Sequence, residues 1–301
     1  MDVVVIIAQF KETLAARGYS PATVTSYSQN IALFSRWLQA EGITDVKQVT
    51  VKVISDYQGH VLQKPVAQET KALYLRPVKR LFEYLVESNQ LLINPAEGIV
   101  ETHRKNRKLA PVLDQNQVKR LLAQPSLSTT TGIRDRAILE VLYATAIRRG
   151  ELINLSVYDA DLKDKVLYIR KAKGRVQRVV PLTKTAASYA EEYLTHIRPR
   201  WAKKAPKQRK LFLINTGQAL NGNALQAMIR KYRLEAKINV PVSAHTLRRS
   251  CATHMLRCGA DIRYVQALLG HRSLRTTQVY TRVAAGDIKQ THDNTHPGKR
   301  L

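Results

Sequence analysis

Acidic residues, cysteines and long apolar runs are all scarce in this 301-residue chain. There are only 23 aspartates and glutamates against 49 lysines and arginines, so the formal net charge is +26. The two cysteines, Cys251 and Cys258, lie about two turns apart on one expected helix, too far for a disulfide. No apolar run approaches the roughly 20 residues of a membrane-spanning helix. These shortages argue against a disulfide scaffold and a membrane protein, and favour a reducing, cytoplasmic setting.

The positive charge is concentrated in the later two thirds of the chain. Residues 1–100 contain 10 basic and 9 acidic residues, whereas the remainder contains 39 and 14. Such an excess is typical of a protein with a polyanionic partner, although a merely solvated basic surface is the simpler alternative. The arginines lie within globular-looking sequence rather than in one amphipathic stripe, so nucleic acid is favoured over a membrane surface.

The first part of the chain, residues 1–100, is predicted to be a helical domain. Gly18 can stop a first helix, Ser20 and Pro21 can begin a second, and Thr50 can cap a third. A fourth helix is expected from about Glu69 to Ser88, with these side chains turned inward: Leu73, Val78, Leu81, Phe82 and Leu85.

Residues 101–111 form a basic segment that we interpret as a linker. Its cations are Arg104, Lys105, Arg107 and Lys108. A solvated loop and a strap that follows a DNA backbone are both consistent with this composition.

Residues 112–301 are predicted to form a second domain that mixes helix and strand and ends in a C-terminal tail. Asp114 and Gln117 form a capping box, and a further helix is expected over 133–146. Strands are expected at 166–169 and 176–180, joined by a basic turn that holds Lys171, Lys173 and Arg175. The whole chain is therefore predicted to be mainly α with a small β-sheet.

Two clusters in this second domain carry chemistry. Ser243 can cap a helix that places His245 and Arg248 three residues apart on one face, where a phosphate can meet an imidazole and a guanidinium. Arg148 is expected at the end of a helix, with Glu151 one turn further on to hold its guanidinium. The alternatives are ordinary: His245 as a cap, Arg248 paired with an acid, and Arg148 with Glu151 as a plain ion pair.

Taken together and in order, these residues resemble the tyrosine recombinases, the family that includes phage integrases and Xer-type recombinases. The matching stretches run from Tyr143 to Leu152, from Lys173 to Leu182, from His245 to Leu256, and from Leu269 through His271 to Tyr280 and Thr281. One departure is Ala146, where many relatives have glycine. The resemblance covers essentially the whole chain and implies a SAM-like, core-binding helical domain before a mixed α/β catalytic domain.

The resemblance also implies a role for each matching residue. Tyr280 is expected to be the nucleophile, and Arg148 and Arg248 to bind the scissile phosphate. Lys173 is expected to protonate the departing 5′ oxygen, although a solvated lysine at a turn is the simpler interpretation of that residue alone. His245 and His271 are expected to assist by hydrogen bonding and proton transfer. Additional DNA contacts are expected from Arg104, Lys105, Arg107, Lys108, Lys171 and Arg175.

The expected reaction is a transesterification that forms a 3′-phosphotyrosine, so no metal, ATP or other cofactor is expected. A zinc site is disfavoured because no Cys-x-x-Cys pair exists, and Cys251, His254 and Cys258 are interpreted as packing residues. The expected partner is double-stranded DNA with an inverted-repeat site, bound by a homotetramer that is a monomer or weak oligomer without DNA. A topoisomerase-like nicking and closing enzyme and a catalytically silent DNA-binding protein are the alternatives.

Overall fold

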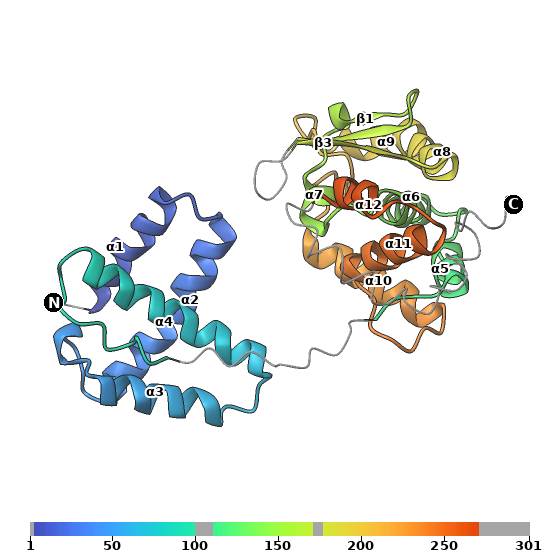
Figure 1. Ribbon diagram of the computed structural model, residues 1–301. Coiled ribbons are helices and arrows are strands. Elements are labelled where there is room, and N and C mark those ends of the chain that lie inside the picture. Colours follow the sequence, from blue (N-terminus) through green and yellow to red (C-terminus); the bar gives the residue numbers. More distant parts are fainter. Residues whose placement is uncertain (1–2, 100–110, 171–176, 271–301) are drawn as a thin grey trace, which may run out of the picture. The chain divides into compact units, whose positions relative to one another are not determined.

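The computed structural model describes residues 3–99, 111–170 and 177–270 (Figure 1). The chain forms two compact units, Met1–Lys108 and Leu109–Leu301. Each unit has its own hydrophobic core.

The first unit is helical, as predicted. Its elements are α1 (Val3–Ala16), α2 (Pro21–Ala40), a short 3-10 helix (Val46–Gln48), α3 (Val51–Gln63) and α4 (Gln68–Glu87). The predicted caps are confirmed: the Ser20 hydroxyl accepts from the Thr23 amide at 3.2 Å and the Thr50 hydroxyl from the Val53 amide at 3.4 Å. Each cap satisfies an N–H group that the first turn of a helix leaves without a partner.

One predicted core position in α4 is wrong. Leu73 is 47% exposed, whereas Leu75 is 1% exposed and packs with Val78. Leu73 precedes Val78 by five residues, which turns it about 140° away around the helix. The core of the unit also continues beyond α4, because Ala96 and Ile99 are buried in it.

The second unit contains the remaining helices and the sheet. Its helices are α5 (Gln115–Ala123), α6 (Thr130–Thr145), α7 (Arg149–Asn154), α8 (Lys184–Glu192), α9 (Arg198–Ala202), α10 (Gly222–Glu235), α11 (Ala244–Arg257) and α12 (Ile262–Leu269), with a 3-10 turn at Val157–Asp159 and a π-helical turn at Tyr193–Ile197. Both bonds of the predicted capping box that joins Asp114 and Gln117 are present.

The sheet has three antiparallel strands in the order β1 (Ala160–Asp161), β2 (Val166–Ile169) and β3 (Arg178–Pro181). The register pairs Ile169 with Arg178 and Leu167 with Val180. The predicted strand at 166–169 is confirmed. Of the predicted strand at 176–180, Val176 lies outside the described residues, Gln177 is not in a strand, and β3 begins at Arg178. Strand β1 was not predicted, because two residues carry no alternation that a pattern could reveal.

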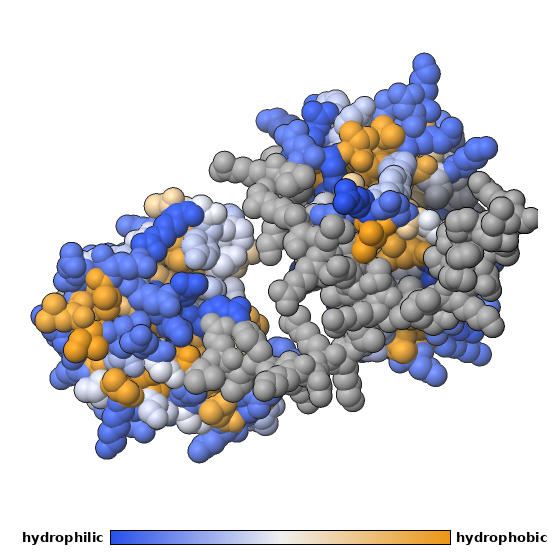
Figure 2. Space-filling view, in the orientation of Figure 1, coloured by the Kyte–Doolittle hydropathy of each residue, from blue (hydrophilic) through white to orange (hydrophobic). Residues whose placement is uncertain are grey.

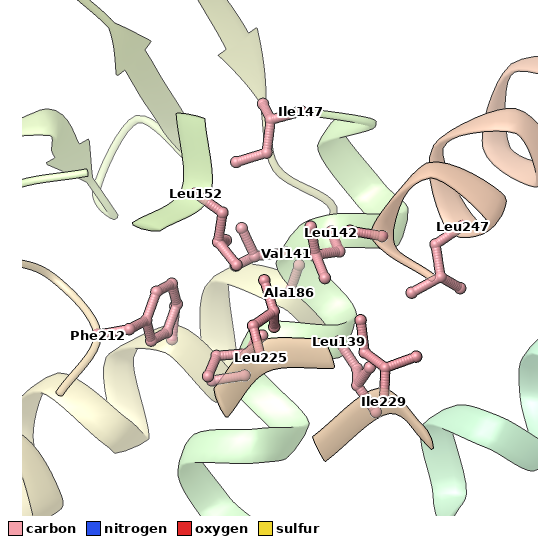
Figure 3. Close-up of a cluster of buried hydrophobic side chains, with 14 of the residues drawn as sticks. Leu139, Val141, Leu142, Ile147, Leu152, Ala186, Phe212, Leu225, Ile229 and Leu247 are labelled. Carbon is pink, nitrogen blue, oxygen red and sulfur yellow. The ribbon is translucent and has the colours of Figure 1, made fainter. Parts of the chain in front are cut away.

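Helix α6 runs through the centre of the second core, and all of its residues from Gly132 onward are buried or half-buried, which explains why its sequence shows little amphipathic pattern. Figure 3 shows its side chains meeting apolar groups from the helices around it. The labelled members of this core are Leu139, Val141, Leu142, Ile147, Leu152, Ala186, Phe212, Leu225, Ile229 and Leu247. The segment that follows α6 is therefore held on a rigid support.

The surface in the view of Figure 2 is covered mainly by hydrophilic side chains over the described parts of both units. Among the described residues, no helix is both long enough and apolar enough to cross a membrane.

Candidate active site

Arg148 lies at the junction of α6 and α7. Helix α6 ends at Thr145, and Ala146 then adopts a left-handed conformation with φ 50°. Arg148 is the N-cap residue of α7. The prediction that Arg148 ends a helix is therefore wrong: it begins the next one, because the left-handed Ala146 terminates α6 two residues earlier.

The Glu151 carboxylate accepts four hydrogen bonds, two from Arg148 and two from Arg178. Its Oε1 accepts from Arg148 Nη1 at 2.9 Å and from Arg178 Nη1 at 3.0 Å. Its Oε2 accepts from the Arg148 amide at 2.8 Å and from Arg178 Nη2 at 2.8 Å. Burial alone would raise the pKa of Glu151, but the bonds from Arg178 and Arg148 lower it to about 2. Glu151 is therefore ionised near neutral pH and holds Arg148, as predicted.

Arg248 lies on α11 and is 2% exposed. Its Nη1 donates to the Ala146 carbonyl at 2.6 Å and its Nη2 to the Leu269 carbonyl at 2.7 Å. The side chain thus joins the turn before Arg148 to the end of α12.

Three consecutive carbonyls at the C-terminal end of α12 accept from three different arginines. The carbonyl of Leu268 accepts from Arg178 Nε at 2.9 Å, Leu269 from Arg248 and Gly270 from Arg148 Nη2 at 3.1 Å. The last carbonyls of a helix lack partners within it, and its dipole favours cations there. We name these three backbone groups, 268–270, the α12 carbonyl turn.

His245 lies on the first turn of α11, where its side chain is partly exposed. Partial burial, followed by the charges of Arg248, Arg249, Arg148 and Arg149, lowers its pKa below the usual value for histidine. The helix cap is Ser243, whose hydroxyl accepts from the Thr246 amide at 3.2 Å. His245 is therefore not the cap of α11, and the charges of several arginines disfavour protonation of its ring.

The remaining predicted site residues lie outside the described part of the chain. They are Lys173, His271 and Tyr280 among the expected catalytic groups, and Arg104, Lys105, Arg107, Lys108, Lys171 and Arg175 among the expected DNA contacts. Arg148 and Arg248 meet at the end of α12, immediately before His271 in sequence, and Glu151 joins this group through Arg148. His245 lies near enough to both arginines for their charges to lower its pKa.

Arg178 is a residue of this site that the sequence interpretation missed. Its side chain is 8% exposed and bonds to Glu151 and to the Leu268 carbonyl. A signal was present in the sequence: strand alternation places Arg178 on the same face as Val180, which is fully buried. A charged residue in the inward phase of a strand needs a buried partner.

The histidine and cysteines of α11 serve packing, with one exception. The Tyr143 hydroxyl and His254 Nδ1 lie 2.8 Å apart, and His254 and Cys251 are both 6% exposed. Burial raises the pKa of the Cys251 thiol to about 12. Cys258 is exposed, so the packing interpretation is wrong for that residue, which is the C-cap of α11. Within residues 3–99, 111–170 and 177–270, no group of histidines, cysteines and carboxylates could hold a metal.

Two family models match the chain. Residues 111–286 match the phage integrase family, and residues 7–89 match the N-terminal SAM-like domain of phage integrases. The two matched segments correspond to the two units of the fold.

Individual relatives cover nearly all of the chain. It is 34% identical to tyrosine recombinase XerC 2 of Ralstonia nicotianae, over 96% of this chain and 84% of that protein. It is 32% identical to tyrosine recombinase XerD of Staphylococcus epidermidis, over 93% of this chain and 94% of that protein.

Solved structures agree with these relatives. The crystal structure of XerA recombinase matches with 26% identity and a TM-score of 0.55, over 98% of this chain and 99% of that one. A lambda integrase dimer bound to a COC′ core site shares the fold with a TM-score of 0.71 at 16% identity, over 93% of this chain and 77% of that one. The chain belongs to the phage integrase family and is a tyrosine-type site-specific DNA recombinase.

Proposed function

We propose that Arg148 and Arg248 bind the scissile phosphate of duplex DNA and that Tyr280 attacks its phosphorus. The observation that carries this proposal is the convergence of the two arginines on the α12 carbonyl turn, ten residues before Tyr280 in sequence. Guanidinium groups held in place before the reaction stabilise the charge that builds on the non-bridging oxygens, at no cost in reorganisation.

The proposed step exchanges one phosphoester bond for another. The Tyr280 oxygen forms a bond to phosphorus, the bond from phosphorus to the 5′ oxygen breaks, and a 3′-phosphotyrosine results. The phenol loses its proton to a neighbouring base, for which His245 and His271 are the candidates, and Lys173 supplies a proton to the departing 5′ oxygen. Attack by another strand's 5′ hydroxyl reverses the step, so the balance of bonds requires no ATP.

The neutral state of His245 supports this assignment. Because partial burial and then the surrounding arginines lower its pKa, the free ring can accept a hydrogen bond or a proton at neutral pH. The four hydrogen bonds to Glu151 support a role in orienting Arg148 rather than one in proton transfer.

We propose a division of labour along the chain: residues 1–100 bind the recombination site, residues 101–111 follow the DNA backbone, and residues 112–301 perform cleavage. Four protomers on two inverted-repeat sites would supply the four active sites that exchange of two duplexes needs. A lambda integrase tetramer has been solved bound to a Holliday junction, and XerH has been solved bound to its difH substrate. A cytoplasmic setting is consistent with a DNA substrate and with two free cysteines.

The substitution Tyr280→Phe tests the nucleophile. It removes one oxygen and little volume, so it should abolish the covalent protein–DNA adduct, seen as a shifted band on a denaturing gel, and leave the dissociation constant for DNA within about 3-fold, less than 1 kcal/mol. Tyr264→Phe is a matched control, because Tyr264 is a half-exposed tyrosine on α12, and the adduct should persist in it. An adduct in Tyr280→Phe that equals the wild-type level would exclude Tyr280.

A further inference from the structure

Arg178 makes as many hydrogen bonds within the site as Arg148 does, although it is not among the residues proposed to bind the phosphate. Its Nη1 and Nη2 donate to the two oxygens of Glu151, at 3.0 and 2.8 Å. Its Nε donates to the Leu268 carbonyl at 2.9 Å. One side chain from β3 thus reaches both α7 and α12.

We propose that Arg178 is a positioning residue, which fixes the Arg148 guanidinium by holding Glu151 on one side and the end of α12 on the other. This inference rests on the proposed role of Arg148 in binding the scissile phosphate. Arg178 acts through Glu151 and the α12 carbonyl turn, and is not itself a ligand of the DNA.

Exposure separates the roles of the two arginines. The Arg178 side chain is 8% exposed, whereas that of Arg148 is 24% exposed. All three guanidinium nitrogens of Arg178 donate to protein groups. Arg148 therefore faces an incoming phosphate, and Arg178 lies behind it.

The contacts close into a ring. Arg178 bonds to Glu151, Glu151 to Arg148, Arg148 to the Gly270 carbonyl, and Arg178 also to the Leu268 carbonyl two residues earlier. Parallel bonds from a planar guanidinium to a carboxylate fix orientation as well as distance. If Arg178 is removed, Glu151 loses two of its four hydrogen bonds and α12 loses one of its three arginine anchors.

Gly270 provides independent evidence that Arg178 has a fixed place. A Cβ at Gly270 would lie 3.1 Å from Arg178 Nη1, 3.2 Å from Cζ and 3.3 Å from Cδ. Gly270 also has φ 62°, a left-handed conformation that other residues adopt at a cost. The guanidinium of Arg178 is thus packed against the residue whose carbonyl receives Arg148.

The effect of Arg178 on the pKa of the buried Glu151 carboxylate allows its role to be measured. The Glu151 side chain is 3% exposed, and the hydrogen bonds from Arg178 are the strongest influence that lowers its pKa against the effect of burial. Arg148 and Arg178 bond directly to Glu151, and the cavity that it borders, of about 570 Å³, is also lined by the Asp159–Arg170 ion pair and by the cations Lys207, Arg209 and Lys210. Without Arg178, Glu151 should take up a proton at a higher pH and release Arg148.

The test uses the full-length chain and a nicked DNA substrate that traps the covalent adduct. Arg178→Gln should slow cleavage by roughly 10- to 100-fold at saturating DNA, because the position of a reacting group is disturbed, while the dissociation constant for DNA changes by less than about 3-fold. Its cleavage rate should also fall as the pH is lowered, over a range where the wild-type rate is constant. Arg178→Lys should restore only part of the rate, since an ammonium cannot make the paired bonds.

Two further variants separate positioning from general loss of structure. In the double variant R178Q/E151Q, the additional decline of the cleavage rate at low pH should vanish, because the carboxylate that takes up the proton is absent. A decline of the rate that is caused by His245 should remain in all variants. Arg134→Gln is the matched control: this buried arginine of α6 bonds to Asp135 and to the Leu213 carbonyl in the same unit. It should lower the melting temperature without altering the pH profile.

Each outcome decides the proposal. The positioning role would be overturned if Arg178→Gln cleaved DNA at the wild-type rate with the wild-type pH profile. It would also be overturned if the loss of cleavage matched a loss of DNA binding. A decline of the cleavage rate at low pH that persists in R178Q/E151Q would likewise overturn it. If Arg178→Gln does not fold, Gly270→Ala displaces the same guanidinium while keeping its charge, and an unchanged cleavage rate there would also overturn it. Absence of an adduct in the wild type would overturn the proposed function instead, and this inference with it.

Discussion

Arginine and lysine perform different tasks at the residue scale. The arginines of the described site are held by carbonyls and a carboxylate, so their positions are set before DNA binds. A proton donor has to move with the departing oxygen, and lysine, with its flexible stem, suits that task. Removal of an arginine and removal of the lysine should therefore cause cleavage defects of different kinds.

A DNA substrate with sulfur in place of the bridging 5′ oxygen distinguishes these two defects. Lys173→Ala should slow cleavage of normal DNA strongly, because an alkoxide is a poor leaving group without a proton. Sulfur in place of the bridging 5′ oxygen gives a leaving group that needs no proton, so the defect of Lys173→Ala should largely vanish in single-turnover cleavage. The defect of Arg248→Ala should remain, since the non-bridging oxygens still need stabilisation. Failure of sulfur to rescue Lys173→Ala would move the role of acid to His245 or His271.

His245 should titrate below the unperturbed value of about 6.5 in the free protein, because partial burial and the nearby arginines disfavour its charged form. The folded state then binds its proton less readily than the unfolded state, so this group lowers stability as the pH falls below about 6.5. NMR titration of Arg249→Gln should show the pKa of His245 moving upward. Arg257→Gln is the control, because Arg257 acts on the pKa of His254, and an equal shift of His245 there would contradict the assignment.

At the scale of elements, the turn between α6 and α7 sets the position of Arg148 and anchors Arg248, the two arginines that we propose to bind the phosphate. Ala146 adopts φ 50° and is fully buried, its carbonyl accepts from Arg248, and Arg148 follows two residues later. An alanine can adopt this conformation at modest cost, whereas a β-branched residue cannot.

The effect of a substitution at Ala146 on stability should therefore depend on how readily the new residue adopts the left-handed conformation. Ala146→Val should destabilise the catalytic unit by about 2 kcal/mol or more, through left-handed strain and overpacking, and should slow cleavage because the Arg248 anchor shifts. Ala146→Gly loses one buried methyl, worth about 0.8 kcal/mol, and gains backbone relief of similar size, so it should melt close to the wild type. Equal melting temperatures for the two variants would show that the turn is not strained.

The elements that the sequence predicted best are those with local signals. Ser20, Thr50, Asp114 and Ser243 cap helices where expected, since a cap needs only its own turn. The junction at Arg148 was predicted less well, because the left-handed Ala146 has no local signature that marks the end of α6. The role of Arg178 could not be predicted, because its partners lie 27 and 90 residues away and are brought together only by the fold.

At the scale of the whole molecule, the positive charge is concentrated in the second part of the chain, where we expect most contacts with the DNA backbone. Residues 1–100 contain 10 basic and 9 acidic residues, so nearly all of the net positive charge lies in residues 101–301. Neutralised phosphates release counterions, so the affinity of such a protein for DNA should fall steeply with salt.

The salt dependence of the affinity reports how many phosphate contacts residues 101–111 make. Replacing Arg104, Lys105, Arg107 and Lys108 by glutamine should reduce the slope of log affinity against log salt by up to about 0.9 for each lost phosphate contact. A linker with residues 101–111 in scrambled order is the control, and its slope should stay at the wild-type value, since phosphate contacts depend on charge and not on side-chain order. An unaltered slope after neutralisation would place the linker outside the interface.

The α12 carbonyl turn has a consequence for how this site changes over evolutionary time. Its three acceptors belong to the main chain, so the identities of Leu268 and Leu269 do not encode the contacts with the arginines. Apolar replacements at these two buried positions leave the acceptors in place as long as the helix ends at the same residue. An insertion or deletion of one residue in α12 would instead displace all three acceptors together. The site should therefore tolerate substitutions in this helix and be intolerant of any change in its length.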